Sequence, residues 1–443
     1  MSALLSLGEG SVLIYFSLLN TATLFSFLAA FRELRRRARE RVYEDLKEVG
    51  RSPLAPRISV LLPAFNEAAR IAESVSALLR LDYPRFEVVV VNDGSTDATL
   101  QVLEEAFALE PAGQEEGGAL PTRRVRGVYR SGTHENLTVL DKDNGGKADA
   151  LNSALNAAQH PYFFSVDAGA VLEPDALLRL VRVTLESTVR VVGVGGAARA
   201  RLSADPLSLF HAVEYFRTRL LAGVAFSSID GLMTLSGAAA LFERDPVAAM
   251  GGYRTDSSGE DLELVTRLHR HLREAGERGY AVRFIPDPVC RDESPSPLSI
   301  LSRQRRRRQR DLLAMLGRNK SMLFDPHYGG IGSVAYPFLL VFEGWGPLLE
   351  GLGYGLFLNA LLRGSHASAF VTDFLSVAVL GGATLSLAGV LLGEAASRRH
   401  PSFPRLVLLA ACATIESLCY RPLTVFMRLL GVADFLLRRG RAA

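Results

Sequence analysis

The stretch from Ser11 to Phe31 contains no charged side chain. Its length matches the ~20 apolar residues that a helix needs to cross the hydrocarbon core of a bilayer. We therefore predict a first transmembrane helix here. A cleaved signal peptide is the alternative, but such a peptide begins with a basic region, whereas Glu9 is the only charged residue before this stretch.

Six arginines follow the apolar stretch: Arg32, Arg35, Arg36, Arg37, Arg39 and Arg41. Because basic residues that flank a span stay in the cytoplasm, they predict a cytoplasmic location for the large polar region downstream. Three more apolar blocks lie near the C-terminus, at Val334–Leu362, Ala367–Leu392 and Leu406–Leu437. The last block contains Arg421, Pro422 and Arg428, so it either spans once or lies partly along the interface. The side on which the chain ends stays open.

Four carboxylates fall within or near these blocks: Glu343, Glu350, Asp373 and Glu416. A carboxylate in lipid is costly, so each is expected to face the interior of the helix bundle. Two interpretations stay open at this point. The carboxylates either line a polar passage or pack against Ser, Tyr or Arg partners.

Composition excludes several other classes of protein. A chain of 443 residues is longer than an ordinary domain with a single hydrophobic core, and its mean hydropathy of +0.16 is high for a soluble protein. The basic runs Arg35–Arg41 and Arg303–Arg310 lack the interleaved aromatic residues of a single-strand binder, so no nucleic-acid partner is expected. Three cysteines without a CxxC pair and eight histidines without an HExxH pattern argue against a structural zinc site.

The polar region alternates between strand and helix patterns. Short β-branched or apolar runs predict strands at Ile58–Leu62, Glu87–Asn92, Thr138–Leu140, Phe163–Val166 and Val191–Val194. Periodic segments predict helices at Ala68–Arg80, Thr96–Leu109, Lys147–Ala158 and Asp175–Ser187. This order predicts an α/β fold with a parallel sheet, in which ligands bind at the carboxyl ends of the strands. The segment Glu110–Pro121 is expected to be a solvated loop.

Two sequence motifs at these strand ends suit a nucleotide. Asp93 closes a strand in NDGSTD, where its carboxylate could accept hydrogen bonds from uracil or ribose. A turn that caps the next helix explains NDGS equally well, and Asp97 is the better candidate for that cap. In NGGK, two glycines permit close backbone approach and Lys147 offers a positive charge to a diphosphate. The spacing is not that of a Walker loop.

An acidic pair, Glu260 and Asp261, stands at the head of a predicted helix. A carboxylate in a cleft could remove the proton of an incoming hydroxyl, so Asp261 is our candidate for a general base. Helix capping is the alternative, and it suits Glu260 better than Asp261.

Taken together, PAFNE at Pro63–Glu67, NDGSTD, NGGKADALN and the segment Ser236–His269 resemble the membrane-bound, polysaccharide-synthase-like family 2 glycosyltransferases. The resemblance implies a GT-A nucleotide-sugar-binding domain. It divides the chain into an N-terminal membrane helix with its basic segment (1–50), a GT-A domain (51–325) and C-terminal transmembrane or interfacial helices (326–443).

The same resemblance implies roles for individual residues. Glu67 and Asp93 would bind the nucleotide, and Asp167 would hold the sugar nucleotide and a divalent cation, Mg²⁺ or Mn²⁺. Ser236 and Gly237 match the acceptor-side segment. Gln304 and Arg307 match the QxxRW motif, in which they serve the acceptor and the diphosphate.

Two positions depart from the family pattern. The family's Asp-any-Asp motif is here Asp167-Ala168-Gly169, which leaves metal dependence open. Arg308 stands where the family has a tryptophan that stacks on the acceptor sugar, so processivity cannot be carried over. A basic stripe on anionic lipid is the alternative for Arg305, Arg306, Arg308 and Arg310.

These observations predict an inverting glycosyltransferase, specifically a hexosyltransferase, of the bacterial inner membrane. It is expected to be multi-pass, with a cytoplasmic catalytic domain and membrane lipid around it. The donor would be a UDP-sugar and the acceptor a glycan or a lipid-linked glycan, with polysaccharide synthesis as the process. A catalytically silent relative that acts as a membrane scaffold is the main alternative, and a transporter is a poorer one because no paired repeat halves are evident. A partner subunit and a homo-oligomer both stay open.

Overall fold

The structure is a computed structural model that describes residues 2–39, 45–113, 118–200, 205–235, 239–256, 259–292, 297–364, 369–396 and 403–442. Contacts divide the chain into two compact units, each described here by itself. The α/β unit comprises Glu40–Arg199 and Leu232–Asp292. The helical unit comprises Met1–Arg39, Ala200–Gly231 and Glu293–Ala443. The helices that follow residues 205 and 297 thus group with the helical unit, although the sequence division assigned them to one domain at 51–325.

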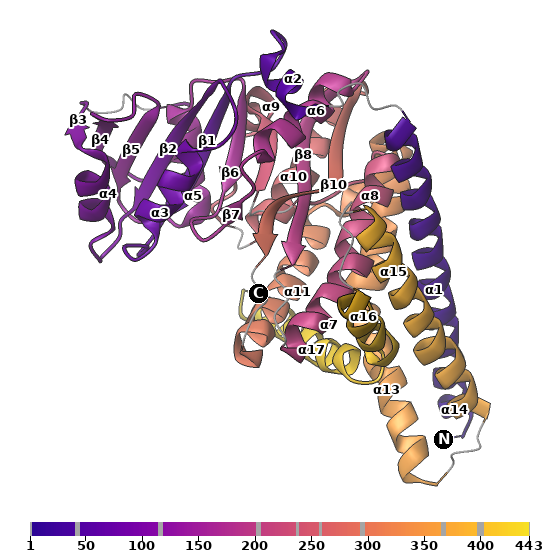
Figure 1. Ribbon diagram of the computed structural model, residues 1–443. Helices are drawn as coiled ribbons and strands as arrows, with labels where there is room; N and C mark the ends of the chain where they lie inside the picture. Colours follow the sequence, from indigo (N-terminus) through magenta and orange to yellow (C-terminus); the bar gives the residue numbers. More distant parts are fainter. Residues whose placement is uncertain are drawn as a thin grey trace. The chain divides into compact units, whose positions relative to one another are not determined.

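The described part of the α/β unit contains a ten-stranded sheet in the order β3-β4-β5-β2-β1-β6-β9-β8-β10-β7 (Figure 1). The strands are β1 (Ile58–Ala64), β2 (Phe86–Asp93), β3 (Leu109–Pro111), β4 (Val125–Ser131), β5 (Leu137–Lys142), β6 (Tyr162–Val166), β7 (Val171–Leu172), β8 (Arg190–Ala200), β9 (Ala239–Glu243) and β10 (Tyr280–Asp292). All five predicted strands are confirmed. The prediction of a wholly parallel sheet is wrong, because β4 and β9 run antiparallel to their neighbours β5 and β6.

Seven helices accompany this sheet in the described residues. They are α2 (Leu46–Arg51), α3 (Ile71–Leu79), α4 (Thr99–Phe107), α5 (Lys147–Ala157), α6 (Ala176–Glu186), α9 (Arg244–Ala249) and α10 (Glu260–Glu274). The four predicted helices are confirmed as α3, α4, α5 and α6. The segment expected to be a solvated loop begins within β3, and part of it, 114–117, lies outside the described residues.

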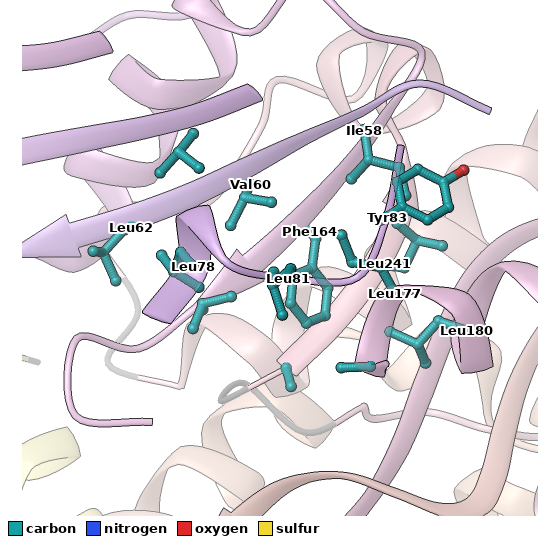
Figure 2. Packing of buried hydrophobic residues seen from close by; sticks show 14 of the residues in the cluster. Ile58, Val60, Leu62, Leu78, Leu81, Tyr83, Phe164, Leu177, Leu180 and Leu241 are labelled. Carbon is teal, nitrogen blue, oxygen red and sulfur yellow. The ribbon is translucent and has the colours of Figure 1, made fainter. Parts of the chain in front are cut away.

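Alternating apolar residues of the central strands fix α3 and α6 against the sheet. Val60 and Leu62 of β1 pack with Leu78 of α3 and Phe164 of β6, and all four are buried (Figure 2). Burying a side chain of this size contributes about 1.5–3 kcal/mol. The core therefore holds the central strands and their ends in place.

Four neighbouring strands, β5, β2, β1 and β6, are parallel. Their carboxyl ends consequently meet at one edge of the sheet. The turns after β1, β2 and β5 and Asp167 after β6 all lie at this edge. The sequence motifs expected at strand ends are thus brought together.

The helical unit contains two helical stretches long and apolar enough to cross a membrane, among the described residues: Ser6–Arg39 and Ala369–Ala396. The first is part of α1 (Ser2–Arg39), and the second consists of α14 (Ala369–Phe374), the π-helix η6 (Leu375–Gly381) and α15 (Gly382–Ala396). They match the predicted spans at Ser11–Phe31 and Ala367–Leu392. A third candidate is α16 (Phe403–Ile415) with α17 (Tyr420–Ala442), a pair bent by 59° at its break.

The predicted apolar block Val334–Leu362 does not form one long helix. It forms two helical stretches with a break at Trp345: a continuous stretch of η4 (Ile331–Ala335), α12 (Tyr336–Phe338) and η5 (Leu339–Gly344), and the 17-residue α13 (Gly346–Leu362). The other helices of the unit are α7 (Pro206–Tyr215), η1 (Phe216–Leu220), α8 (Leu221–Ser228), α11 (Leu298–Arg318), η2 (Lys320–Met322) and η3 (Pro326–Tyr328).

Three of the four carboxylates in the apolar blocks have arginine partners. The pairs are Glu343 with Arg428 at 2.9 Å, Glu350 with Arg421 at 3.0 Å and Glu416 with Arg217 at 2.9 Å. Tyr15 also donates a hydrogen bond to Glu350, and Ser386 donates one to Glu416. These contacts favour the interpretation in which the carboxylates pack against internal partners. Asp373 is exposed.

Candidate active site

Lys147 lies at the centre of three carboxylates in the α/β unit. Its Nζ is 2.9 Å from Asp167 Oδ1, 3.2 Å from Glu260 Oε1 and 3.7 Å from Asp261 Oδ2. These four residues come from three segments that are far apart in the sequence. The structure thus joins the predicted diphosphate-binding lysine, the predicted metal ligand and the predicted base in one site.

Local structure explains why these side chains meet. Lys147 is the first residue of α5 and follows Gly146, whose φ of +86° favours glycine. Asp167 directly follows β6. Glu260 and Asp261 occupy the first turn of α10, where the helix dipole stabilises negative charge. The backbone therefore presents one cation and three anions to the same point.

The charges in this cluster shift the protonation equilibria of its members. Burial raises the pKa of Asp261 to about 6; Lys147 opposes this shift, and the charges of Glu260 and Asp167 add to it. For Lys147, burial opposes the charged form, but the three carboxylates outweigh burial and raise its pKa. Near neutral pH, Lys147 is thus positively charged and Asp261 is mostly ionised, as a general base must be.

The raised pKa of Asp261 predicts how transfer depends on pH. A general base acts only when it is deprotonated, so kcat/KM should fall as the pH drops through about 6. Initial rates between pH 4.5 and 8.5 would measure this acidic limb of the pH profile. Assays at neutral pH after preincubation at each pH would confirm that the protein stays folded. A limb near 4, the ordinary pKa of an aspartate, would contradict the assignment.

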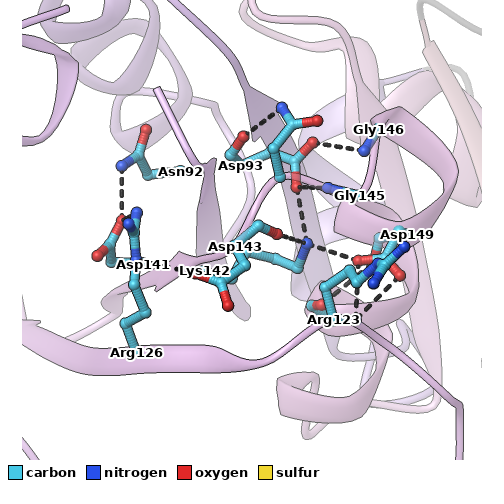
Figure 3. A network of polar contacts seen from close by, with 12 residues as sticks. Asn92, Asp93, Arg123, Arg126, Asp141, Lys142, Asp143, Gly145, Gly146 and Asp149 are labelled. Atoms are coloured by element: carbon cyan, nitrogen blue, oxygen red, sulfur yellow. Dashed lines mark hydrogen bonds and ion pairs between the residues drawn. The ribbon is translucent and has the colours of Figure 1, made fainter. Parts of the chain in front are cut away.

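Asp93 fixes the turn that precedes Lys147. Its carboxylate accepts hydrogen bonds from the backbone N–H groups of Gly145 at 3.0 Å and Gly146 at 2.7 Å (Figure 3). Asn144 also donates its side-chain N–H to the Asp93 carbonyl at 2.7 Å. Asp93 is 3% exposed, and its carboxylate stabilises the NGGK turn through these hydrogen bonds.

Lys142 is a buried residue next to the NGGK turn that the sequence did not reveal. Its side chain is fully buried, and its Nζ lies 2.7 Å from Asp93 and 2.5 Å from Asp149. Lys142 and Asp93 are opposite each other in the register of β5 and β2. Opposite charges just after two predicted parallel strands are the signal that could have found this pair.

The turn after β1 is tied to the turn after β2. Asn66, with a φ of +57°, accepts a hydrogen bond from the Thr96 N–H at 2.8 Å. Asp97 accepts one from the Thr99 N–H at 3.0 Å, which confirms its predicted role at the head of α4. Glu67 donates its backbone N–H to Thr99 Oγ1, and its side chain is partly exposed.

Four other predicted site residues fall outside the described part of the α/β unit. Ser236 and Gly237 fall outside the described residues. Gln304 and Arg307 are exposed on α11 in the helical unit, and Arg307 lies 3.6 Å from Asp311. The site within the α/β unit therefore comprises Lys147, Asp167, Glu260 and Asp261, with Asp93 behind the turn.

The alternative of a lipid-facing basic stripe on α11 meets a structural objection. Arg305 is 13% exposed and forms an ion pair with Glu214, and Arg306 pairs with Asp434 at 2.9 Å. Arg310 lies 3.4 Å from Asp311. Three of the four arginines in that stripe thus have internal partners.

Comparison with known proteins places this geometry in a family. The family model "Glycosyl transferase family 2" matches residues 59–250, which include β1, β2 and Lys147. The model "Glycosyl transferase family group 2" matches residues 162–388, just over half of the chain. The chain belongs to glycosyltransferase family 2.

Similar curated proteins of this family are poly-beta-1,6-N-acetyl-D-glucosamine synthases. The protein of Staphylococcus aureus strain COL is 26% identical over 256 residues, which cover 56% of this chain and 52% of that protein. The Staphylococcus epidermidis protein is 24% identical over 300 residues, which cover 64% of this chain and 63% of that protein. The chain thus spans roughly half to two thirds of the length of these relatives.

A solved structure confirms the GT-A fold of this family 2 glycosyltransferase. That solved structure is of a mannosyltransferase from Pyrobaculum calidifontis in complex with GDP-Man and Mn²⁺. The match covers 96% of this chain and 99% of that one, with a TM-score of 0.51 and 21% identity. At this identity the likeness establishes the fold alone.

The cluster around Lys147 has the charge, but not by itself the ligand set, for a divalent cation. Three carboxylates surround a single ammonium, so the cluster has excess negative charge, and carboxylate oxygens are the ligands that Mg²⁺ prefers. No group of three or more His, Cys, Asp or Glu side chains with metal-binding geometry occurs among the described residues. The fit therefore requires donor phosphate oxygens in addition to Asp167.

Gly169 stands where the family resemblance predicts a second acidic residue. A Cβ added there would meet no atom within 4 Å among the described residues, and its φ lies outside the range that only glycine favours. The β-carbon of an aspartate therefore displaces no described neighbour.

We predict that Gly169→Asp strengthens metal dependence. Because ligand charge sets divalent affinity, the Mn²⁺ concentration for half-maximal nucleotide release should fall by about tenfold. Gly169→Asn is the matched control, since it adds the same volume without the charge. Equal Mn²⁺ concentrations for half-maximal release by the two variants would contradict the prediction.

Proposed function

We propose that this protein is an inverting glycosyltransferase that moves a hexose from a UDP-sugar to a glycan or lipid-linked acceptor. The observation that carries this proposal is the convergence of Lys147, Asp167, Glu260 and Asp261 on one point. A base with a pKa near the working pH stands beside a cation that suits a diphosphate.

The reaction follows from these positions. Asp261 accepts the proton of the acceptor hydroxyl as the oxygen attacks the anomeric carbon of the donor. The new glycosidic bond forms while the bond from that carbon to the diphosphate oxygen breaks. The leaving group is the nucleoside diphosphate, and a single displacement by one base, without a protein nucleophile, inverts the configuration at the anomeric carbon.

Lys147 stabilises the charge that develops on the leaving diphosphate. Ammonium groups aimed at developing charge act most strongly where water is excluded, and Lys147 is only partly exposed. A divalent cation held by Asp167 and the diphosphate would supply further positive charge there. Once Lys147 binds the diphosphate, its contact with Asp261 weakens and the base is available to the acceptor.

Further residues are assigned by the family motifs alone. We assign nucleotide binding to Glu67 and Asp93, and acceptor contacts to Ser236 and Gly237. Gln304 and Arg307 would serve the acceptor and the diphosphate. For Asp93 the role is partly indirect, since its carboxylate already holds the Gly145–Gly146 backbone.

The relatives support a polysaccharide as product, and the apolar helices of this chain support a membrane as location. Both named relatives are synthases of a polymer of N-acetylglucosamine, so UDP-N-acetylglucosamine is the first donor to test. We propose a multi-pass protein of the bacterial inner membrane with its catalytic domain in the cytoplasm. The arginines after the first apolar stretch support this orientation. A partner subunit or a homo-oligomer would be compatible with it.

Nucleotide release by the full-length protein in isolated membranes tests the function. UDP-N-acetylglucosamine, UDP-glucose and GDP-mannose would be supplied with Mg²⁺ or Mn²⁺, and the product would then be sized. Release above that of Asp261→Asn with one donor supports the proposal. Release no greater than that of Asp261→Asn with every donor would instead support the silent scaffold, which the loss of the second acid at Gly169 favours.

A further inference from the structure

A second cavity, of about 380 Å³, lies on the α/β unit beside α5. Three segments form its walls: Pro121–Arg123 before β4, Asp149 and Asn152 of α5, and the loop Gly251–Asp256 after α9. None of the three carboxylates that surround Lys147 lines it. Its volume is at the lower end of the ~300–1,000 Å³ range of small-molecule sites, which suits a ligand the size of a monosaccharide.

Hydrogen bonds hold the walls of this cavity in place. Asn152 donates its amide N–H to the Tyr253 carbonyl at 2.8 Å and accepts the Tyr253 N–H at 2.7 Å. On the other side, Asp149 accepts the Arg123 N–H at 3.1 Å (Figure 3). A site whose walls are fixed in advance loses less entropy when it binds a ligand.

The charges around the cavity leave one cation unbalanced. Asp149 pairs with Lys142 at 2.5 Å, although Lys142 also pairs with Asp93 at 2.7 Å, and Arg254 pairs with Asp256 at 2.5 Å. The Arg123 guanidinium is exposed and has no ion pair among the described residues. The cavity therefore presents one guanidinium without a carboxylate partner, a group that binds carboxylates and phosphates through two parallel hydrogen bonds.

The other lining groups select among anionic ligands. Asn152, Thr122 and Thr255 offer amide and hydroxyl groups of the kind that pair with sugar hydroxyls. A nucleobase would need an exposed aromatic face, but Tyr253 is 2% exposed. The lining thus fits a sugar that carries an acidic group better than it fits a nucleotide.

Tyr253 connects this cavity to the catalytic cluster. Its ring packs edge-on against Phe163 of β6, with centroids 6.4 Å apart. Burial and then the charge of Asp261 raise the pKa of its hydroxyl, so the phenol senses the catalytic carboxylate. The loop that carries Tyr253 also leads directly into α10, which begins at Glu260.

We propose that this cavity is a second carbohydrate site, which binds an anionic monosaccharide unit through Arg123. A ligand held there contacts the loop that ends at the catalytic carboxylates, and it thereby alters the rate of sugar transfer. The binding itself does not depend on the proposed transferase activity; the effect on rate rests on it.

Titration of the full-length protein in detergent with D-glucuronate tests the site, with D-glucose as the uncharged comparison. A charge-assisted pair contributes about 1.5–3 kcal/mol, so Arg123→Gln should weaken glucuronate binding by about tenfold or more. Arg130→Gln is the matched control, because Arg130 is also an exposed arginine of this segment, on β4, outside the cavity. Saturating UDP should leave glucuronate bound, and Asp261→Asn should bind it normally.

Three results would overturn the proposal: equal binding of glucuronate and glucose, undiminished binding by Arg123→Gln, or displacement of glucuronate by UDP. The effect on transfer is measured separately, as nucleotide release with and without glucuronate. A rate that changes in the wild type but not in Arg123→Gln supports the coupling, and an unchanged wild-type rate rejects it. Absence of any nucleotide release would defeat the proposed function and leave the binding result intact.

Discussion

Asp261→Asn is expected to lower kcat for sugar transfer by about 10²- to 10⁴-fold, the contribution of a well-placed general base. Asparagine keeps the shape of the side chain but cannot accept the proton of the acceptor hydroxyl. Donor binding should persist, because Lys147 retains Asp167 and Glu260 as partners. Rates of nucleotide release and calorimetric titration with UDP would measure the two effects separately.

Glu274→Gln is a suitable control for this variant. Glu274 is the last residue of α10 and its side chain is 49% exposed, so the change removes a carboxylate from the same helix at the other end. Its kcat should equal that of the wild type. Turnover of Asp261→Asn within a few-fold of this control would rule out the general-base role.

Lys142→Met should destabilise the protein by about 3–5 kcal/mol, the cost of removing one partner from a buried ion pair. The side chains of Lys142, Asp93 and Asp149 are 0%, 4% and 8% exposed, so the two carboxylates would be left facing each other without a cation or bulk water. The apparent unfolding midpoint of the full chain in detergent should fall strongly. The NGGK turn should loosen as well, because Asp93 holds it.

Two further variants separate the loss of the buried ion pair from the general effect of replacing a charged side chain by methionine. Arg270→Met removes an exposed partner of Glu274, and such pairs contribute only about 0.3–0.5 kcal/mol. Lys142→Met combined with Asp149→Asn should recover part of the lost stability, since it removes one of the two uncompensated charges. A Lys142→Met midpoint equal to that of Arg270→Met would contradict the importance of the buried lysine.

The parallel half of the sheet was predictable because its strands are apolar and β-branched. Runs such as VVVV in β2 have high strand propensity and are bounded by turn residues. The strand β9, AALFE, lacks that composition, and β10 contains Pro286 and Pro288, which usually argue against a strand. Their pairing depends on contacts with the sheet, which local sequence does not encode.

The site was predictable where a motif joins chemistry to a strand end or a helix start. Lys147, Asp167 and Asp261 satisfy this condition, and the structure brings them together. In the sequence, Lys142 resembles an ordinary polar residue next to a turn. Its partner Asp149 lies on the following helix, so the ion pair forms only in the folded structure. In the helical unit, hydropathy identified the apolar block at Val334–Leu362 but did not reveal the break in the helix at Trp345.

The open space at Gly169 has an evolutionary consequence. Every glycine codon becomes an aspartate or glutamate codon by a single base change, and the added β-carbon would meet no described atom within 4 Å. Relatives of this chain with and without the second acid could therefore interconvert by one mutation. Reliance on a metal ion would then be a trait that a lineage gains or loses readily, rather than a property fixed by the fold.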